Sequence, residues 1–223
     1  MQRVKLAPSM MCVDFLHVKQ YLDIFIHQHI DYLHIDIMDG HYVPNFTLGP
    51  DFCRALASYT DIPLDIHLMV ERPDRFVPLF TFPGSVISFH PETTYHPIRT
   101  IQLIKAQQAR AGIVLDPAMP LEQVRHLLPH VDLVCIMTVN PGYAGQKLVP
   151  GSIHKIGELA ETAARHRYEL EIEVDGNVSW ENIPKMVDAG GEVLVAGTSS
   201  IFQKGGNIEE NIRAMRELVG GMT

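Results

Sequence analysis

Runs of β-forming residues alternate with helix-length amphipathic segments along the whole sequence of 223 residues. We expect strands at residues 4–7, 32–37, 64–68, 86–89, 112–115, 133–137, 171–174 and 193–196. The segments between them predict helices at residues 14–29, 49–59, 74–80, 98–108, 121–128, 152–167, 181–188 and 209–219. Strands that alternate with helices form a parallel sheet, and eight such units predict a single (β/α)8 TIM barrel.

These units extend over residues 1–223 without a linker or a shift in composition, so we expect one domain of the α/β class. An open, doubly wound sheet is the alternative. The glycine fingerprint G-x-G-x-x-G, which such a sheet often carries after its first strand, is absent from this sequence. Hydrophobic residues make up 46% of the chain, which is enough to form a sizeable core.

Charge and cysteine content limit which binding partners and which cellular compartment are expected for this chain. The chain has 18 Lys and Arg residues against 26 Asp and Glu residues, and its net charge of −8 argues against a general nucleic-acid binder. We expect no membrane span and no leader peptide, because the sequence has no run of about 18 apolar residues and no apolar N-terminal stretch. Its three widely spaced cysteines do not form a disulfide framework. Together these features predict a cytoplasmic protein without nucleic-acid or membrane partners.

Polar and apolar side chains alternate in the second and third predicted strands. Because successive side chains of a strand point to opposite faces, the aliphatic residues at 33, 35 and 37 are expected to face the helices. The residues on the inward face are His34, Asp36 and Met38 in one strand and Asp65, His67 and Met69 in the next. Asp175 is expected to point inward at the end of the seventh strand.

A buried imidazole or carboxylate needs a partner, because burying an unpaired charge is costly. Two imidazoles and two carboxylates from this inward set can meet at the C-terminal end of the barrel, where active sites of this fold lie. They form a complete ligand set for Zn²⁺, Mn²⁺, Fe²⁺ or Co²⁺, whereas Mg²⁺ is less natural with two imidazoles. His90 follows the fourth strand, and the sequence leaves open whether it contacts this site.

Small residues follow the sixth, seventh and eighth predicted strands. Such loops let backbone N–H groups approach an anion, and the loops after strands 7 and 8 commonly hold phosphate in this fold. The pattern therefore predicts a phosphate site. The loop residues concerned are Gly142, Tyr143, Ala144 and Gly145, then Gly176 and Asn177, and finally Gly197, Thr198 and Ser199.

Several of these motifs occur together in one known family. Residues 33–45, LHIDIMDGHYVPN, and residues 137–146, MTVNPGYAGQ, resemble the two signatures of the ribulose-phosphate 3-epimerase family. The shorter motifs APS at 7–9, DIHLM at 65–69, EVDG at 173–176 and AGTS at 196–199 are also similar and occur in the same order. The resemblance spans nearly the whole chain.

The resemblance implies a homo-oligomeric (dimeric or hexameric) 3-epimerase of ketose phosphates with one divalent cation per chain. It assigns the cation to His34, Asp36, His67 and Asp175, with Asp36 and Asp175 as the acid/base pair. In such an enzyme a proton leaves C3 and returns through a metal-stabilised enediolate. The residues expected beside the substrate are Ser9, Met38, His67, Met69 and Met137. The glycine-containing loops would hold its phosphate.

Details of the motifs bear on the sugar. Residues 9–12, SMMC, and residues 90–93, HPET, are similar to those of D-allulose-6-phosphate 3-epimerases. We therefore expect interconversion of D-allulose 6-phosphate and D-fructose 6-phosphate. The alternative is interconversion of D-ribulose 5-phosphate and D-xylulose 5-phosphate, with which Asn140 agrees. Asn177 and Leu148 match neither pattern.

Two other classes of protein compete with an epimerase. A Schiff-base aldolase needs a lysine inside the barrel near its C-terminal end, but Lys5 lies early in the first strand and Lys147 lies in a loop. A non-catalytic sugar-phosphate-binding barrel is the remote alternative. It has no need to place two carboxylates against two imidazoles.

Overall fold

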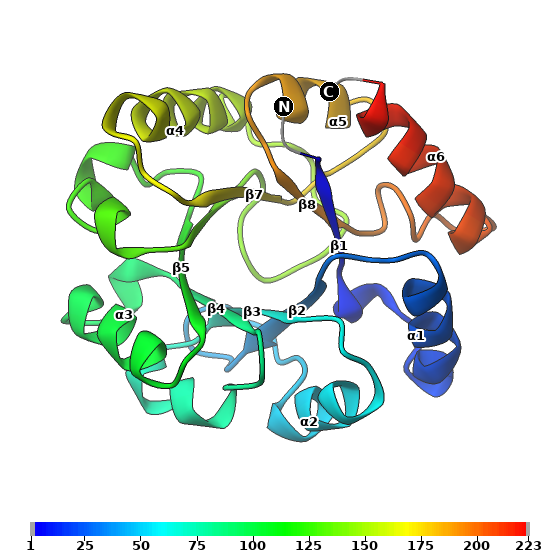
Figure 1. Ribbon diagram of the computed structural model, residues 1–223, viewed down its shortest axis with the longest axis horizontal. Helices are drawn as coiled ribbons and strands as arrows, with labels where there is room; N and C mark the ends of the chain where they lie inside the picture. Colours follow the sequence, from blue (N-terminus) through cyan, green and yellow to red (C-terminus); the bar gives the residue numbers. More distant parts are fainter. Residues whose placement is uncertain (1–2, 222–223) are drawn as a thin grey trace.

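Eight parallel strands form a nearly closed barrel with the helices on its outside (Figure 1). This computed structural model describes residues 3–221. The strands are β1 (Lys5–Pro8), β2 (Leu33–Met38), β3 (Leu64–Met69), β4 (Val86–Phe89), β5 (Arg110–Leu115), β6 (Leu133–Met137), β7 (Glu171–Asp175) and β8 (Val193–Ala196). They pair in the order β1-β8-β7-β6-β5-β4-β3-β2, and an isolated bridge between Ser9 and His34 joins β1 to β2. The predicted (β/α)8 barrel is confirmed.

The α-helices follow six of the strands. They are α1 (Val18–His27), α2 (Pro50–Tyr59), α3 (Pro97–Ala106), α4 (Ser152–His166), α5 (Ile183–Asp188) and α6 (Ile208–Gly220). The helix predicted to begin at residue 14 starts with the short 3₁₀ helix η2 (Phe15–His17), where Asp14 accepts a hydrogen bond from the Leu16 N–H. The domain expected over residues 1–223 includes residues 1, 2, 222 and 223, which lie outside the described range.

The α-helices predicted at 74–80 and 121–128 are wrong. The first segment forms the 3₁₀ helices η3 (Pro73–Arg75) and η4 (Val77–Leu79), and the second forms η6 (Leu121–Val124) and η7 (Leu128–His130). Pro78 is the physical reason in the first segment, because proline has no N–H to donate to the carbonyl four residues earlier, and Pro129 stops the second segment from continuing as an α-helix beyond residue 128. The backbone bonds i to i+3 instead, as from the Phe80 N–H to the Val77 carbonyl and from the His130 N–H to the Leu127 carbonyl.

The alternation predicted for β2 and β3 separates two environments. Leu33, Ile35 and Ile37 are buried in the apolar layer between the barrel and the helices. The polar residues between them point into the barrel, and this is what brings side chains from different strands together. Among the described residues, no helix is both long and apolar enough to cross a membrane.

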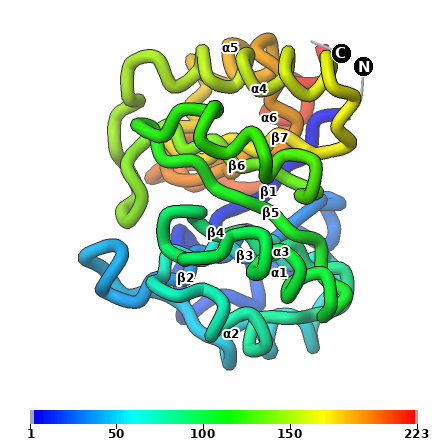
Figure 2. Tube along the Cα trace, turned by 90° about the vertical axis from the view of Figure 1, so that its left-hand side faces the viewer, coloured from blue at the N-terminus to red at the C-terminus, as the bar shows by residue number. Residues whose placement is uncertain are grey.

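The two ends of the barrel differ in chemistry. At the N-terminal end, Glu171 accepts hydrogen bonds from Lys5 and from the Tyr32 hydroxyl at 3.0 Å, and it forms an ion pair with Arg110 at 3.1 Å. At the C-terminal end the loops after β2 and β6 project together (Figure 2). There the Asn45 side chain donates to the Gly142 carbonyl at 2.9 Å. Charged side chains thus fill the N-terminal end of the barrel, whereas the loops at the C-terminal end are placed to contact a ligand.

Candidate active site and metal centre

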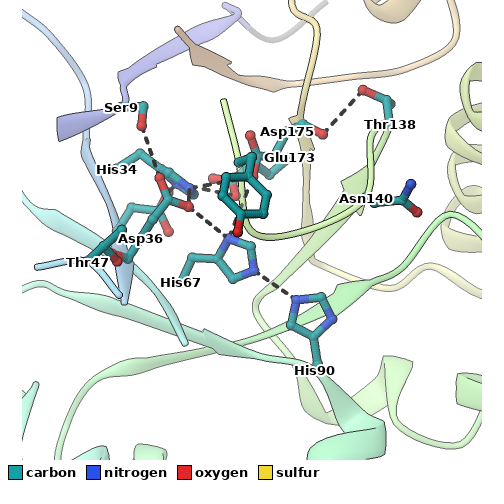
Figure 3. Close-up of polar contacts among 12 residues, drawn as sticks. Ser9, His34, Asp36, Thr47, His67, His90, Thr138, Asn140, Glu173 and Asp175 are labelled. Atoms are coloured by element: carbon teal, nitrogen blue, oxygen red, sulfur yellow. Dashed lines mark hydrogen bonds and ion pairs between the residues drawn. The ribbon is translucent and has the colours of Figure 1, made fainter. Parts of the chain in front are cut away.

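Two histidines and two aspartates meet inside the barrel where β2, β3 and β7 end (Figure 3). One ligand atom from each of His34, Asp36, His67 and Asp175 lies within 4.8 Å of all the others. His34 Nε2 lies 3.3 Å from Asp36 Oδ1 and 3.8 Å from Asp175 Oδ2. His67 Nδ1 lies 3.4 Å and 3.6 Å from the same two oxygens. The sequence-predicted metal ligands are therefore brought together.

The donor set fits a divalent cation. His34 Nε2 and His67 Nδ1 are buried and have no hydrogen-bond partner among the described residues. Four atoms held about 2.0–2.1 Å from a tetrahedral ion lie about 3.3–3.4 Å apart, which is close to the separations seen here. Imidazole and carboxylate donors suit Zn²⁺, Mn²⁺, Fe²⁺ and Co²⁺.

The charges of the site are complementary before any cation binds. Burial disfavours protonation of both imidazoles, yet the carboxylates around them raise the pKa of His34 and of His67 above the usual value. Burial likewise disfavours an ionised Asp36, but His34 and His67 hold the pKa of that carboxyl well below its usual range. Asp36 is therefore an anion at neutral pH. A cation that binds here displaces protons from the imidazoles.

A buried carboxyl pair lies beneath His34. Asp65 Oδ2 is 2.6 Å from His34 Nδ1, which fixes the ring with Nε2 toward the site. Glu173 Oε1 lies 3.8 Å from the same nitrogen. Burial, reinforced by the negative charge of Asp65, raises the pKa of Glu173 well above its usual value. Sequence reasoning missed Glu173, although it lies two residues before Asp175 on the same face of β7.

The other metal-site histidine has a different partner. His67 Nε2 lies 3.0 Å from Nε2 of His90, which is fully buried. His90 Nδ1 in turn lies 2.9 Å from the Tyr42 hydroxyl. Burial, with the nearby His67, lowers the pKa of His90. The contact that the sequence left open for His90 is therefore made, and its link to Tyr42 was not foreseen.

Four of the five residues expected beside the substrate border a pocket above the metal site, whereas His67 is not among the residues that line it. The empty volume of the pocket is about 550 Å³, and Ser9, Met38, Met69 and Met137 line it. The Ser9 hydroxyl donates to Asp36 Oδ2 at 3.0 Å, which leaves Asp36 Oδ1 facing the histidines. Met38 and Met69 form an apolar cluster with Val43. The pocket therefore combines a polar floor with an apolar wall.

All of the residues predicted to hold phosphate border the same pocket. They are Gly142, Tyr143, Ala144, Gly145, Gly176, Asn177, Gly197, Thr198 and Ser199. Gly176 has a φ of +107°, and a Cβ there would lie 2.5 Å from a Val139 methyl carbon, so this position needs glycine. The Asn177 amide donates to the Gln146 carbonyl at 2.7 Å and accepts from Asn182 at 2.7 Å. The side chain of Asn177 therefore ties two loops together.

Thr138 fixes the end of β7 beside the site. Its N–H donates to the Asp175 carbonyl at 2.7 Å, and its hydroxyl donates to the Gly176 carbonyl. These bonds hold the backbone that carries Asp175. The role of Thr138 was not predicted, because register between β6 and β7 is not readable from alternation within one strand.

Comparison with known proteins places this site in a family. Residues 5–202 match the model of the ribulose-phosphate 3 epimerase family. The ribulose-phosphate 3-epimerase of Bacillus subtilis is 43% identical over 198 residues, covering 88% of this chain and 91% of that protein. The Serratia marcescens enzyme of the same name is 40% identical, covering 91% of this chain and 97% of its own. The chain belongs to the ribulose-phosphate 3-epimerase family.

Solved structures with low sequence identity agree on the fold alone. The structure of KGPDC from Streptococcus mutans superposes with a TM-score of 0.71 at 12% identity, covering 99% of both chains. A mutant tryptophan synthase alpha-subunit from Pyrococcus furiosus gives a TM-score of 0.69 at 13% identity, covering 99% of this chain and 100% of that one. Barrels of this fold catalyse different reactions, so the chemistry of this chain has to be argued from the residues of its site.

Membership of the epimerase family makes the chain an isomerase that acts on carbohydrate phosphates. The aldolase alternative lacks its essential group, since no lysine is among the residues that border the pocket within residues 3–221. Lys5 is bound to Glu171 at the opposite end of the barrel. The family is metal-dependent, which agrees with the His and Asp cluster found here.

Proposed function

We propose that this ketose-phosphate 3-epimerase interconverts D-ribulose 5-phosphate and D-xylulose 5-phosphate. The curated relatives from Bacillus subtilis and Escherichia coli, 43% and 38% identical, support this substrate by their names. The observation that carries the chemistry is that Asp36 and Asp175, which both border the pocket, lie around two buried and unpartnered histidine nitrogens. An acid/base pair and a cation site are what epimerisation beside a carbonyl group needs.

The two aspartates act as the acid and the base. One carboxylate removes the proton from C3 on one face of the substrate, and the other residue, as a carboxylic acid, returns a proton on the opposite face. One proton leaves and one arrives, so only the configuration at C3 changes. Asp36 and Asp175 come from different strands, which lets them approach the substrate from different sides. Reversal of the reaction exchanges their roles.

His34, Asp36, His67 and Asp175 would together hold the divalent cation. When bound, the cation supplies Lewis-acid stabilisation of the negative charge that develops on the substrate oxygens beside C3. Ser9 orients Asp36 through its hydroxyl. Met38, Met69 and Met137 exclude water from the reacting carbon, which strengthens electrostatic interactions there.

The loops after β6, β7 and β8 would bind the phosphate group through backbone N–H groups. Gly142, Gly145 and Gly176 have φ values of +115°, +78° and +107°, a region that lets the backbone form an anion-binding concavity. Tyr143 donates from its hydroxyl to the Pro44 carbonyl at 2.5 Å and holds the β6 loop against the β2 loop. This places the phosphate at one edge of the pocket and the sugar over the metal site.

D-allulose 6-phosphate is the second candidate substrate. The motifs SMMC at residues 9–12 and HPET at residues 90–93 favour it. Met11 and Cys12 both border the pocket, so this difference in sequence lies where a longer sugar would contact the protein. Asn140, which also borders the pocket, agrees with the pentulose.

A side-by-side assay distinguishes the two substrates. C3 epimerisation of D-ribulose 5-phosphate and D-fructose 6-phosphate is followed with the same preparation, before and after chelation and with divalent ions added back. We expect kcat/KM to be at least about tenfold higher for the pentulose, a difference of about 1.4 kcal/mol. A tenfold preference for the hexulose would assign D-allulose 6-phosphate instead. Turnover that survives verified metal removal would contradict the mechanism.

A further inference from the structure

We propose that His90, Tyr42 and Glu92 form a hydrogen-bond chain that positions His67 as a metal ligand. The chain runs from the surface to the metal site and makes Nδ1 the nitrogen of His67 that is free to bind. This inference rests on the proposed metal-dependent function. It assigns a purpose to three residues that the mechanism itself does not use.

The contacts of the chain are short and continuous. The Tyr42 hydroxyl donates to Glu92 Oε1 at 2.7 Å, and His90 Nδ1 lies 2.9 Å from the same hydroxyl oxygen. His90 Nε2 lies 3.0 Å from His67 Nε2. The rings of His67 and His90 have centroids 5.2 Å apart, and those of Tyr42 and His90 are 4.7 Å apart. Two side chains, His90 and Tyr42, thus connect His67 to the Glu92 carboxylate, which is 34% exposed and also lies 3.4 Å from His90 Nδ1.

The direction of each hydrogen bond follows from the Glu92 carboxylate at the outer end of the chain. An ionised carboxylate only accepts, so the Tyr42 hydroxyl donates its proton to Glu92. The lone pairs of that oxygen are then left to accept from His90 Nδ1–H. A neutral imidazole carries one proton, so His90 Nε2 accepts, and the group that donates to it is His67 Nε2–H. His67 Nδ1 is consequently the nitrogen with a lone pair.

Nδ1 is also the nitrogen that faces the metal site. It lies 3.4 Å from Asp36 Oδ1 and 3.6 Å from Asp175 Oδ2, and it has no hydrogen-bond partner among residues 3–221. His34 likewise keeps a lone pair on the nitrogen that faces the site, because Asp65 accepts directly from its Nδ1–H. The two histidine ligands are thus oriented by different devices, one of which extends to the surface.

Zinc affinity tests the proposal without reference to turnover. Metal-free protein is titrated with Zn²⁺ against a chromophoric chelator, and the visible spectrum of the Co²⁺-loaded protein is recorded for each variant. Loss of such an outer partner typically weakens metal binding by about 10–100-fold. We expect His90→Leu to weaken Zn²⁺ binding by at least about tenfold and to change the Co²⁺ spectrum. His90→Gln, whose amide oxygen can accept from His67, should restore the affinity to within about threefold.

Tyr42→Phe tests the outer half of the chain at a less buried position. It should weaken Zn²⁺ binding by about three- to tenfold, because His90 Nδ1–H loses its nearest acceptor. Tyr59→Phe is the matched control, since the Tyr59 hydroxyl also donates to a carboxylate, that of Asp23, but contacts neither His90 nor His67. The control should bind Zn²⁺ as tightly as the unaltered protein.

The outcomes separate this proposal from the function itself. Tyr42→Phe with the same affinity as Tyr59→Phe would overturn the chain, and so would equal affinities for His90→Leu and His90→Gln. Where His90→Leu does not fold, Tyr42→Phe decides. Unaltered protein that binds no Zn²⁺ would overturn both proposals. Variants that lose affinity as expected, in a protein that does not epimerise ketose phosphates, would support the chain and contradict the proposed function.

Discussion

Asp36 and Asp175 are held differently although they face the same two histidines. Asp36 is buried, with 6% of its side chain exposed, and accepts from Ser9. The Asp175 side chain is 16% exposed, and its backbone is fixed by Thr138. Each residue is expected to serve both as a ligand and as an acid or base. Removing either negative charge therefore affects turnover more than folding.

Asp36→Asn and Asp175→Asn should each lower kcat by at least about 10²-fold, because an amide cannot exchange a proton with C3. Far-UV circular dichroism checks the fold, and metal analysis of each purified variant separates lost acid/base chemistry from lost cation. A folded variant that contains metal and keeps more than a tenth of the original rate would contradict the two-carboxylate mechanism.

Cys12 lies in the pocket beside this charge. Burial, with a further contribution from the Asp36 carboxylate, raises the pKa of the Cys12 thiol to about 11. Because a raised pKa keeps the thiol protonated near neutrality, iodoacetamide should alkylate Cys12 slowly at about pH 7, and the rate should rise about tenfold per pH unit toward the pKa. Peptide mass spectrometry measures the rate, with Cys12→Ser as the blank. A fast rate that is already constant near pH 8 would contradict this environment.

The residues that alternation within one strand could predict were placed correctly. His34 and His67 follow from the period-two patterns within β2 and β3, and Asp175 from the pattern at the end of β7, and the three side chains lie together in the structure. The link through Tyr42 could not be found this way, because Tyr42 lies in the loop after β2, whereas His90 and Glu92 both follow β4. Contacts between loops depend on backbone paths that no local periodicity encodes.

At the scale of elements, the strands were predictable because buried parallel strands are short apolar runs with clear ends. The two segments that form 3₁₀ helices were not predicted correctly. The prediction followed the amphipathic spacing at residues 74–80 and 121–128 and took no account of Pro78. Val77 and Phe80, three residues apart, are both buried as a helical pattern requires, although no α-helix forms there. Periodicity thus located the connections but misjudged their geometry.

Gly176 tests how closely the loop after β7 must approach its neighbour. Gly176→Ala places a Cβ 2.5 Å from Val139 Cγ2 and 2.9 Å from its backbone nitrogen. Gly151 also has a positive φ, +85°, but has open space around its missing side chain, so Gly151→Ala is the matched control. We expect Gly176→Ala to lower the free energy of unfolding by about 1–3 kcal/mol more than Gly151→Ala does. Both variants strain a backbone with positive φ, but only Gly176→Ala adds a steric clash.

Urea denaturation measures both alanine variants, and KM for the phosphorylated substrate provides a second readout. KM should rise for Gly176→Ala, whose loop borders the pocket. Equal free energies of unfolding for the two variants would contradict the close approach at Gly176.

At the scale of the whole molecule, the charged cluster at the N-terminal end of the barrel stabilises the fold without taking part in the chemistry. Glu171 receives hydrogen bonds or ion pairs from Lys5, Tyr32 and Arg110, which begin or precede three other strands. It therefore joins separate parts of the sheet at the end opposite the pocket. The homo-oligomer that the family resemblance implies stays a prediction, which sedimentation of the full chain addresses.

Glu171→Gln should lower the free energy of unfolding by about 1–3 kcal/mol, since it leaves two cations facing each other without their anion. Glu181→Gln is the control, because Glu181 pairs with Lys185 at 3.0 Å on an exposed surface and such pairs contribute about 0.5 kcal/mol or less. Both variants should keep kcat within about twofold, because neither touches the site. Equal destabilisation of the two would contradict the role given to the cluster.

Solvent isotope incorporation at C3 tests the central claim that two carboxylates act on opposite faces of the substrate. D-ribulose 5-phosphate is converted by the metal-loaded enzyme in D₂O, and the D-xylulose 5-phosphate formed early in the reaction is analysed by proton NMR. The account predicts deuterium at C3 of the product, because the proton that arrives comes from an aspartic acid in exchange with solvent and differs from the one that leaves. Product that retains its original C3 protium would contradict the two-carboxylate mechanism.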